Sequence, residues 1–261
     1  MPRELTPSFC TPLTLAECLA QLDEHGFDPA DELSLQNAAS LLAGLAANRG
    51  FLGDLLIDLL AGADDQASGY GPQAIMLAGP RNGYFLRANI WPARGDPVFE
   101  ASGAASFVYG LPHDHNFDFL TVGYFGPGYV SDYWEYDYAS VSGEVGEHVD
   151  LRFVERSRLR EGRVLHYRAH RDVHCQHPPE SLSVSLNICA ANPAQGWFDQ
   201  YRFDTEAGRI AGVLNASANE VLLMLGVALG GEDARHCAQH FATHHPSAAM
   251  RRVASGMIRS E

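Results

Sequence analysis

Two histidines separated by a single residue, His113 and His115, are the residues of this chain best placed to do chemistry together. On an extended strand, side chains alternate between the two faces, so both imidazoles would project from the same side and grip one metal ion. A third histidine from a later strand would complete the set and leave other coordination positions open for water, dioxygen or a substrate. The sequence therefore predicts a metal site at this segment.

Histidines recur further along the chain, and one of them is expected to supply the third ligand. They are His166, His170, His174 and His177. His174 fits best, because it ends an Asp-Val-His segment that closely precedes the apolar run 182–188, as where a ligand-bearing strand turns back into a barrel wall. His170 and His177 remain alternatives. Asp118 is expected to play a supporting or structural role, because alternation turns it away from the histidine pair.

The middle of the chain carries short alternating or apolar runs separated by glycine and proline, which is the pattern of β-strands joined by turns. The predicted strands are 84–91, 117–124, 129–136, 148–154, 163–167 and 182–188. No long helical pattern interrupts this zone, so a parallel α/β sheet is disfavoured. We expect a β domain over 72–205 that folds as a small antiparallel barrel or jelly roll, with the histidine pair near its mouth.

Helical patterns flank this β zone on both sides. In residues 1–68 apolar residues recur with helical spacing, and Thr14 with Glu17 matches a capping box. Residues 62–72 are small, polar and glycine-rich, as in a linker. In residues 209–261, helices are expected at 221–229, at 232–244 and from Pro246 through 258. These helical N-terminal and C-terminal segments are expected to pack together or to cover a face of the barrel, and they offer an interface for a homodimer.

The composition suits a globular protein, since 46% of the 261 residues are apolar and 19% are charged. The formal net charge of −14 argues against nucleic acid or an anionic membrane as the main partner, because both require a basic face. All 18 basic residues are arginine. Since there is no lysine, Schiff-base chemistry and the anchoring of pyridoxal phosphate are excluded.

The five cysteines are scattered and form no CxxC pair, so they do not indicate a disulfide framework. The N-terminal segment lacks the long apolar core of a secretion signal. No apolar run approaches the roughly 20 residues that a membrane-spanning helix needs. We therefore expect a cytoplasmic protein that binds neither membrane nor nucleic acid.

At its histidine motif the chain resembles the cupin superfamily. The first cupin motif is a glycine, then His-x-His, then a later glycine, and the second motif supplies one more histidine. The matches are Gly110, His113, His115 and Gly123 or Gly126 for the first motif, and His174 for the second. The resemblance implies a cupin barrel, a jelly-roll-like antiparallel fold, here mainly β with helical extensions.

Within that superfamily the chain looks most like the cysteine-dioxygenase-like thiol dioxygenases, which share a His-Asp-His run and lack a carboxylate ligand. The residues that carry this likeness are His113-Asp114-His115 and Val184-Ser185-Leu186. Because three neutral histidines bind Fe(II) in those enzymes, the resemblance implies an iron centre held by His113, His115 and His174. It also implies a substrate site in which Arg87 would hold a carboxylate and Ser185 and Asn187 would lie beside the metal.

Two departures from the family pattern bear on the substrate. Phe119 or Leu120 occupies the position of the glutamate that many cupins carry. The thiol dioxygenases have a Ser-x-His-x-Tyr set beside the iron, whereas this chain keeps Ser185 and has Asn187 and Cys189 in place of the other two. Cysteine is therefore not the expected substrate.

An aromatic-rich run, 129–138, supplies a further pair of candidate catalytic residues. Alternation places Tyr133 and Glu135 on one face of this predicted strand. If that face is interior, burial would raise the pKa of the carboxyl group towards 7, where general acid–base catalysis is most effective. Tyr133 and Glu135 would then form a proton-transfer pair.

Together these features favour a non-haem Fe(II) oxygenase or dioxygenase that oxidises a small organic molecule with O2. Zn(II), Mn(II) or Ni(II) would accept the same nitrogens, because ligand identity alone does not select the metal. A metal-dependent isomerase, lyase or hydrolase is therefore one alternative. A non-catalytic cupin sensor of a small molecule, with the C-terminal helices as a partner-binding module, is the other.

Overall fold

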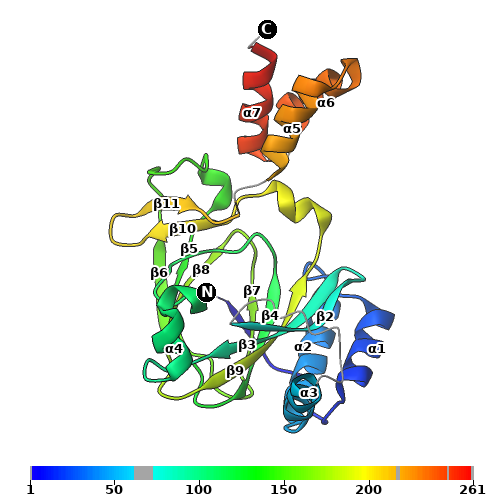
Figure 1. The fold of residues 1–261 in the computed structure, drawn as a ribbon, viewed down its shortest axis with the longest axis vertical. Coiled ribbons are helices and arrows are strands. Elements are labelled where there is room, and N and C mark those ends of the chain that lie inside the picture. Colours follow the sequence, from blue (N-terminus) through cyan, green and yellow to red (C-terminus); the bar gives the residue numbers. More distant parts are fainter. Residues whose placement is uncertain (1, 62–72, 216–217, 246, 260–261) are drawn as a thin grey trace.

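Two antiparallel β-sheets form the centre of the computed structural model, which describes residues 2–61, 73–215, 218–245 and 247–259 (Figure 1). Within those residues the larger sheet has six strands in the order β1-β7-β4-β9-β3-β2. In chain order these strands are β1 (Arg3–Leu5), β2 (Ala74–Arg81), β3 (Tyr84–Trp91), β4 (Phe119–Phe125), β7 (Val164–Tyr167) and β9 (Ser183–Ala190). The pairing of strands far apart in sequence, with β4 between β7 and β9, is that of a jelly-roll-like barrel, as predicted.

The second sheet is built from two parts that the histidine segment joins. One part pairs β6 (Arg152–Arg158), β5 (Val130–Glu135) and β8 (Asp172–His177), and the other pairs β10 (Tyr201–Asp204) with β11 (Arg209–Val213). His113 lies between them, because it bridges His174 of β8 on one side and Arg202 of β10 on the other. The candidate ligands are therefore fixed within sheet pairing and not on a free loop.

Three helices, α1 (Leu15–His25), α2 (Glu32–Ala47) and α3 (Phe51–Leu60), lie against the larger sheet (Figure 1). The predicted capping box starts α1: the side chain of Thr14 accepts from the backbone N–H of Glu17, and the Glu17 carboxylate accepts from the Thr14 N–H. α2 contacts β4 and β9, and it is buried along most of its length because it lies on the sheet. Its leucines share one apolar core with the outward residues of the sheet.

Alternation along β3 and β9 sorts their side chains between this core and the barrel interior. Leu86 of β3 and Leu186 of β9 pack into the helix-covered core. The neighbouring Arg87 and Asn187, which are direct partners across the two strands, line an interior cavity instead. Because one face is sealed by apolar packing, the polar residues of the other face are committed to the interior.

The turn between β4 and β5 depends on glycine. Gly128 has a φ of 76°, in the left-handed region that favours glycine. A Cβ atom at this position would collide with the backbone carbonyl of Leu159. The tight approach lets β5 return beside the chain segment that follows β6.

Helices α5 (Ala218–Leu229), α6 (Glu232–His244) and α7 (Ala248–Arg259) form a separate unit that projects from one end of the barrel (Figure 1). α6 packs mainly on α7, and α5 contacts both more lightly. The unit touches the β domain where the ring of Trp197 lies 5.1 Å from that of His245. A short helix, α4 (Pro97–Ser102), follows β3.

Three predicted boundaries need correction. The strand predicted at 148–154 is β6, from Arg152 to Arg158, because His148 instead bridges Arg209 of β11. β11 also lies in the C-terminal segment 209–261, where only helix was predicted, and the helices begin at Ala218. The N-terminal segment likewise contributes β1, which pairs with β7. The predicted linker 62–72 and the predicted helix start at Pro246 lie outside the described residues.

In the described part of the chain, no single helix is long and apolar enough to cross a membrane. One pair of helices, Glu32–Ala47 with Phe51–Asp58, passes the same test by length and composition alone, with a 70° bend between them.

Candidate metal centre

Three histidine side chains converge on one point inside the barrel. The ligand atoms of His113, His115 and His174 all lie within 4.8 Å of one another, and all three residues are buried. The Nε2 atoms of His115 and His174 are 3.0 Å apart, and those of His174 and His113 are 3.2 Å apart. The structure thus brings His174, and not His170 or His177, beside His113 and His115.

Backbone pairing holds this arrangement. The N–H of His113 donates to the carbonyl of His174 at 3.0 Å, and the N–H of His174 returns the bond at 2.9 Å. The carbonyl of His115 accepts from the N–H of His170 at 2.8 Å. Residues 113–115 are extended and form isolated β-bridges at His113, but they are not part of a longer strand. The imidazoles of His113 and His115 still point to the same side, as alternation predicts.

Asp114, between the two histidines, faces the opposite way and anchors the segment. Its Oδ2 accepts from the hydroxyl of Tyr136 at 2.6 Å, and its Oδ1 accepts from the backbone N–H of Tyr201 at 2.6 Å. The side chain is fully buried, and burial raises the pKa of its carboxyl group to about 7. Asp114 therefore ties the end of β5 and the start of β10 to the histidine segment.

The protonation of the three imidazoles suits a cation. Burial lowers the pKa of His113 to about 4 and holds the pKa values of His115 and His174 well below their usual value, so all three are neutral at pH 7. The Nδ1 of His113 lies 2.8 Å from the carbonyl oxygen of Leu111. A carbonyl only accepts, so Nδ1 carries the proton and Nε2 presents a lone pair to the site.

The spacing of the nitrogens fits one metal ion. Metal–nitrogen bonds of about 2.0–2.1 Å place neighbouring ligands roughly 2.9–3.4 Å apart in octahedral or tetrahedral sets. The two Nε2 separations, 3.0 and 3.2 Å, lie in this range. Lone pairs that face one another at this distance repel unless a cation or a proton lies between them. The residues present therefore fit a divalent metal.

Gln176 supports His174 from the same strand. Its amide nitrogen lies 3.0 Å from Nδ1 of His174 and 3.2 Å from Nε2 of the same ring, while its Oε1 is buried and has no partner. Gln176 therefore places a polar amide beside the His174 imidazole at the edge of the site.

The three imidazoles lie at the wall of a cavity of about 500 Å³. The wall is aromatic on several sides, through Phe85, Trp91, Phe117, Phe119 and Tyr129. Its polar members apart from the histidines include Arg87, Asn89, Gln176 and Asn187. The described lining residues include no aspartate or glutamate, so Arg87 is the one charged side chain among them at neutral pH.

The substrate residues implied by family resemblance divide into two groups. Arg87 and Asn187 line the cavity. Ser185 is buried, and its Oγ accepts from the indole N–H of Trp91 at 3.0 Å, so it supports the wall from behind and is not part of it. Cys189 is also buried, and burial raises the pKa of its thiol to about 11. The thiol is therefore protonated at neutral pH.

Tyr133 is buried and Glu135 lies at the end of β5, but neither residue is among those that line the cavity. The hydroxyl of Tyr133 lies 2.9 Å from that of Tyr167 in the aromatic core beside the histidines. Glu135, at the end of β5, forms ion pairs with Arg168 and Arg152. Partial burial alone would raise the pKa of Glu135, but its ionic partners, Arg168 among them, lower it to about 2. A permanently ionised carboxylate of this kind does not shuttle protons at neutral pH.

The remaining histidines of the β zone have structural partners. His166 and Asp118 are 2.9 Å apart, which gives Asp118 the structural role expected for it. His177 pairs with Asp132 at 2.8 Å on the outer side of β8. His170 lies in the β7–β8 turn against the rings of Tyr138 and Phe198.

Sequence reasoning missed Asn89 and Trp91 as cavity residues. Both follow from Arg87 at intervals of two residues along the predicted strand 84–91, which is β3 as predicted. The signal was therefore available once Arg87 was placed inside the barrel. The face of β3 that points inward depends on which face the helices cover, and that is a property of the whole fold.

Comparison with family models and with curated proteins finds no match. Solved structures that this chain matches include a DMSP lyase from Ruegeria pomeroyi, at 12% identity over 72% of this chain and 78% of that one, with a TM-score of 0.29. A cupin-like protein from Thermotoga maritima is 10% identical over 54% and 89% of the two chains, with a TM-score of 0.27. A hydroquinone dioxygenase in complex with Cd2+ is 12% identical over 48% and 68%, with a TM-score of 0.28.

Proposed function

We propose that this chain is a non-haem iron enzyme that oxidises a small, negatively charged organic substrate with dioxygen. The observation that supports this most directly is the meeting of three buried, neutral imidazoles, those of His113, His115 and His174, at the wall of one cavity. An Fe(II) ion held by their Nε2 atoms would supply the redox chemistry that activation of dioxygen requires.

The charge of the site favours an anionic substrate. Neutral histidines cancel none of the charge of a divalent ion, and no described residue of the cavity wall carries a negative charge. Arg87 adds a positive charge close enough to lower the pKa values of His113 and His115, although burial is the larger cause of both shifts. An anion that enters this cavity gains attraction from both centres in a low-dielectric interior.

The polar groups of the wall favour redox chemistry over proton transfer. An isomerase, lyase or hydrolase moves protons near neutral pH through a side chain or through water bound to the metal. The described lining residues offer no carboxylate, and burial raises the pKa of Tyr129 above its usual value. The histidines of the wall are needed as ligands. This scarcity of acid–base groups supports an oxygenase over the metal-dependent alternatives.

The aromatic wall has a role of its own. The ring centroid of Trp91 lies 4.2 Å from that of Tyr129, and Phe119 stacks on Tyr167 with centroids 4.4 Å apart. Packed rings of this kind keep water away from reacting atoms and strengthen electrostatic contacts inside. They also hold the imidazole of His174, whose ring centroid lies 4.9 Å from that of Tyr167.

Metal content and oxygen consumption test the proposal. Protein purified without added metal is analysed, stripped, and reloaded anaerobically with Fe(II) or with Zn(II). We expect the Fe(II) form to consume oxygen with at least one member of a panel of small carboxylic acids, and the Zn(II) form to consume none. Stoichiometric Zn(II) in the purified protein, with no oxygen consumption by the Fe(II) form, would contradict the proposal. Tight binding of an acid without any product would favour the sensor.

A matched pair of variants localises the activity. His174→Ala removes a proposed ligand, whereas His177→Ala removes a histidine of the same strand that points to Asp132. We expect the first variant to lose iron and oxygen consumption together, and the second to keep both within about twofold of the parent, since it leaves the three nitrogens in place. Equal losses of iron and oxygen consumption in the two variants would show a general effect on the fold and would contradict the specific role of His174.

A further inference from the structure

Three polar side chains on the inner face of β3 and β9 have buried polar atoms without a partner. They are Nε of Arg87, Oδ1 of Asn89 and Nδ2 of Asn187. All three residues line the cavity, and Asn89 and Asn187 are 8% and 3% exposed. Because buried polar groups are nearly always hydrogen-bonded, a cluster of unsatisfied ones in a cavity indicates the groups of a ligand.

These atoms lie within reach of one small molecule. Arg87 and Asn187 are direct partners across the two strands, and Asn89 is the next residue on the same face of β3. Positions two residues apart on one face are separated by about 7 Å at Cβ, which their side chains span from either side. The histidines line the same cavity from the facing sheet.

The unsatisfied atoms specify the ligand by donor and acceptor. The Nε of Arg87 and the Nδ2 of Asn187 are donors, and together they suit the two oxygens of a carboxylate. As the amide of Asn89 is oriented, its Oδ1 is an acceptor and pairs with a donor on the ligand, whereas the reverse orientation would present Nδ2 in its place. A hydroxyl both donates and accepts, so it suits either orientation without adding charge. An ammonium group would enter beside Arg87 and a divalent ion with no carboxylate among the described lining residues to balance it.

We infer that the cavity binds a carboxylic acid with a hydroxyl group on the carbon next to the carboxylate, and with an apolar remainder against the aromatic wall. This inference rests on the proposed function only for the oxidation of the acid after it has bound. Recognition by Arg87, Asn187 and Asn89 requires no turnover, so binding alone tests it.

Three compounds that differ at a single position are suitable probes: 3-phenyllactate, phenylalanine and 3-phenylpropanoate. Their affinities are measured by calorimetry with the Zn(II)-loaded protein, which does not consume them, and with the metal-free protein. We expect 3-phenyllactate to bind about tenfold more tightly than 3-phenylpropanoate, as one added hydrogen bond to a buried acceptor allows, and phenylalanine to bind most weakly. Equal binding of the hydroxy acid and the plain acid, or preference for phenylalanine, would overturn the inference.

Two variants of Asn89 sharpen the test. Asn89→Leu keeps the volume and removes the acceptor, so the preference for the hydroxy acid should fall to about twofold or less. Asn89→Asp keeps the shape and adds the missing negative charge, so phenylalanine should gain relative to 3-phenyllactate. Unchanged preferences in a folded Asn89→Asp protein would overturn the inference even if the leucine variant does not fold. Failure to consume oxygen would leave these comparisons standing, so the two proposals can fail separately.

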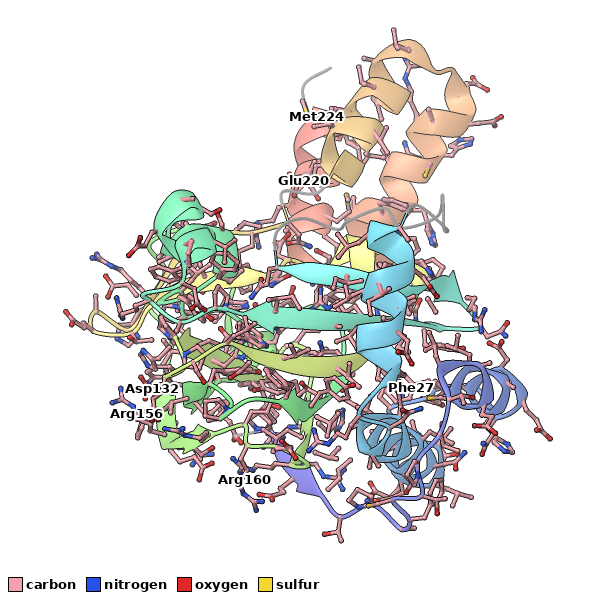
Figure 2. The ribbon with its side chains drawn as sticks, turned by 60° about the horizontal axis from the view of Figure 1, so that its bottom comes forward. Phe27, Asp132, Arg156, Arg160, Glu220 and Met224 are labelled. Atoms are coloured by element: carbon pink, nitrogen blue, oxygen red, sulfur yellow. The ribbon has the colours of Figure 1, made fainter. Side chains whose placement is uncertain are left out.

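A second, independent observation concerns α5, whose apolar side chains face solvent. The exposed residues are Val221, Leu222, Met224, Leu225 and Leu229, each about half exposed or more. In Figure 2, Met224 lies on the projecting helical unit, well away from the barrel. From Val221 to Leu229 the helix has no charged residue. A helix that is apolar around most of its surface is normally buried.

A second copy of this chain fits the face better than other occupants do. Exposed side chains of this size present on the order of 100 Å² each, so two facing copies would bury roughly 1,000 Å², the lower limit for a specific interface. The stretch Val221–Leu229 brings no like-charge repulsion to the contact, although Glu220 lies in the first turn of α5 and the chain carries a net charge of −14. A membrane surface would require basic residues around the apolar face, and α5 has none. We propose that α5 packs on α5 of a second copy in a symmetric dimer.

The oligomeric state of the full chain in solution tests this. We expect light scattering to give about twice the chain mass of 28.4 kDa at micromolar concentration, and Leu225→Glu to give the single-chain mass. Gln239→Glu, on the exposed polar side of α6, is the control with the same added charge and should remain dimeric. A single-chain mass for the unmodified protein up to about 100 µM, or a dimer that survives both Leu225→Glu and Leu222→Glu, would refute the proposal.

Discussion

Asp114 should control metal affinity although its side chain points away from the metal. Its carboxyl group accepts from the Tyr136 hydroxyl and from the Tyr201 N–H, both at 2.6 Å and both buried. Asp114→Ala leaves these two donors without a partner. At about 1–3 kcal/mol for each buried unsatisfied group, the two donors lower the free energy of unfolding by about 2–6 kcal/mol. Part of this loss is offset, because the variant no longer has to protonate a carboxyl of raised pKa on folding, which costs about 3 kcal/mol at pH 6.

The effect on the metal follows from the position of Asp114 between two ligands. Once its anchors are lost, the segment His113–His115 is held by backbone pairing alone. Disturbing the groups that orient metal ligands typically lowers affinity by about 10- to 100-fold. We expect a loss of this size in Asp114→Ala. Asp114→Asn keeps an acceptor for Tyr201, and the Tyr136 hydroxyl can turn to accept from the new amide, so its affinity should stay within about threefold of the parent.

The assay is a competition titration of metal against a chromophoric chelator, with urea unfolding of the metal-free proteins alongside. Both are run at pH 6, below the raised pKa of Asp114, so that the acid and the amide are both mainly uncharged. Asp132→Ala is the matched control, because Asp132 is also a buried acid with two partners, Arg156 and His177, on the outer side of the sheet. It should lose stability and keep its metal affinity. Full metal affinity in a destabilised Asp114→Ala protein would refute the reasoning.

Three further predictions follow from single contacts. Burial lowers the pKa of His170 from 6.5 to about 4, so the folded state favours the neutral imidazole and loses up to about 3 kcal/mol of stability as the pH falls from 6.5 to 4. Asparagine tolerates the φ of 57° at this position, so His170→Asn should reduce the difference in unfolding free energy between pH 7.5 and pH 4.5, measured by urea titration. Gly128→Ala should lower the free energy of unfolding more than Gly162→Ala does. Gly162 is the control, because its φ is also positive but an added Cβ would meet nothing within 4 Å. Equal losses of about 1 kcal/mol in the two variants would show that the Cβ added at position 128 does not clash with Leu159. Glu135→Gln should leave oxygen consumption within about twofold, because the carboxylate is held by arginines outside the cavity, and a loss of 100-fold would restore it as a catalytic residue.

The metal ligands were predictable from the sequence because the evidence for them is local. Two histidines at an interval of two residues must share a face wherever the chain is extended, and the structure keeps that geometry at His113 and His115. The third ligand required a choice among histidines at similar spacing. His174 pairs with His113 across the sheet, whereas His177 lies three residues later and turns to the other face.

Features that depend on long-range pairing were not predictable in the same way. Alternation places Glu135 on a face of its strand but does not say that Arg168 and Arg152 lie beside it in the folded chain. The strand β11 lies in a segment for which the sequence predicts only helix, because its short sequence becomes a strand by pairing with β10. Intrinsic β-propensity is weak without such partners.

The central claim is that three histidines hold one metal ion, and the metal content of a double variant tests it most directly. Wild-type protein and His113→Ala/His174→Ala are purified in parallel without added metal, reloaded anaerobically with Fe(II), and desalted, and circular dichroism verifies that both are folded. We predict about one iron per chain in the wild type and less than about a tenth of that in the double variant. Equal iron content in the two folded proteins would contradict the account.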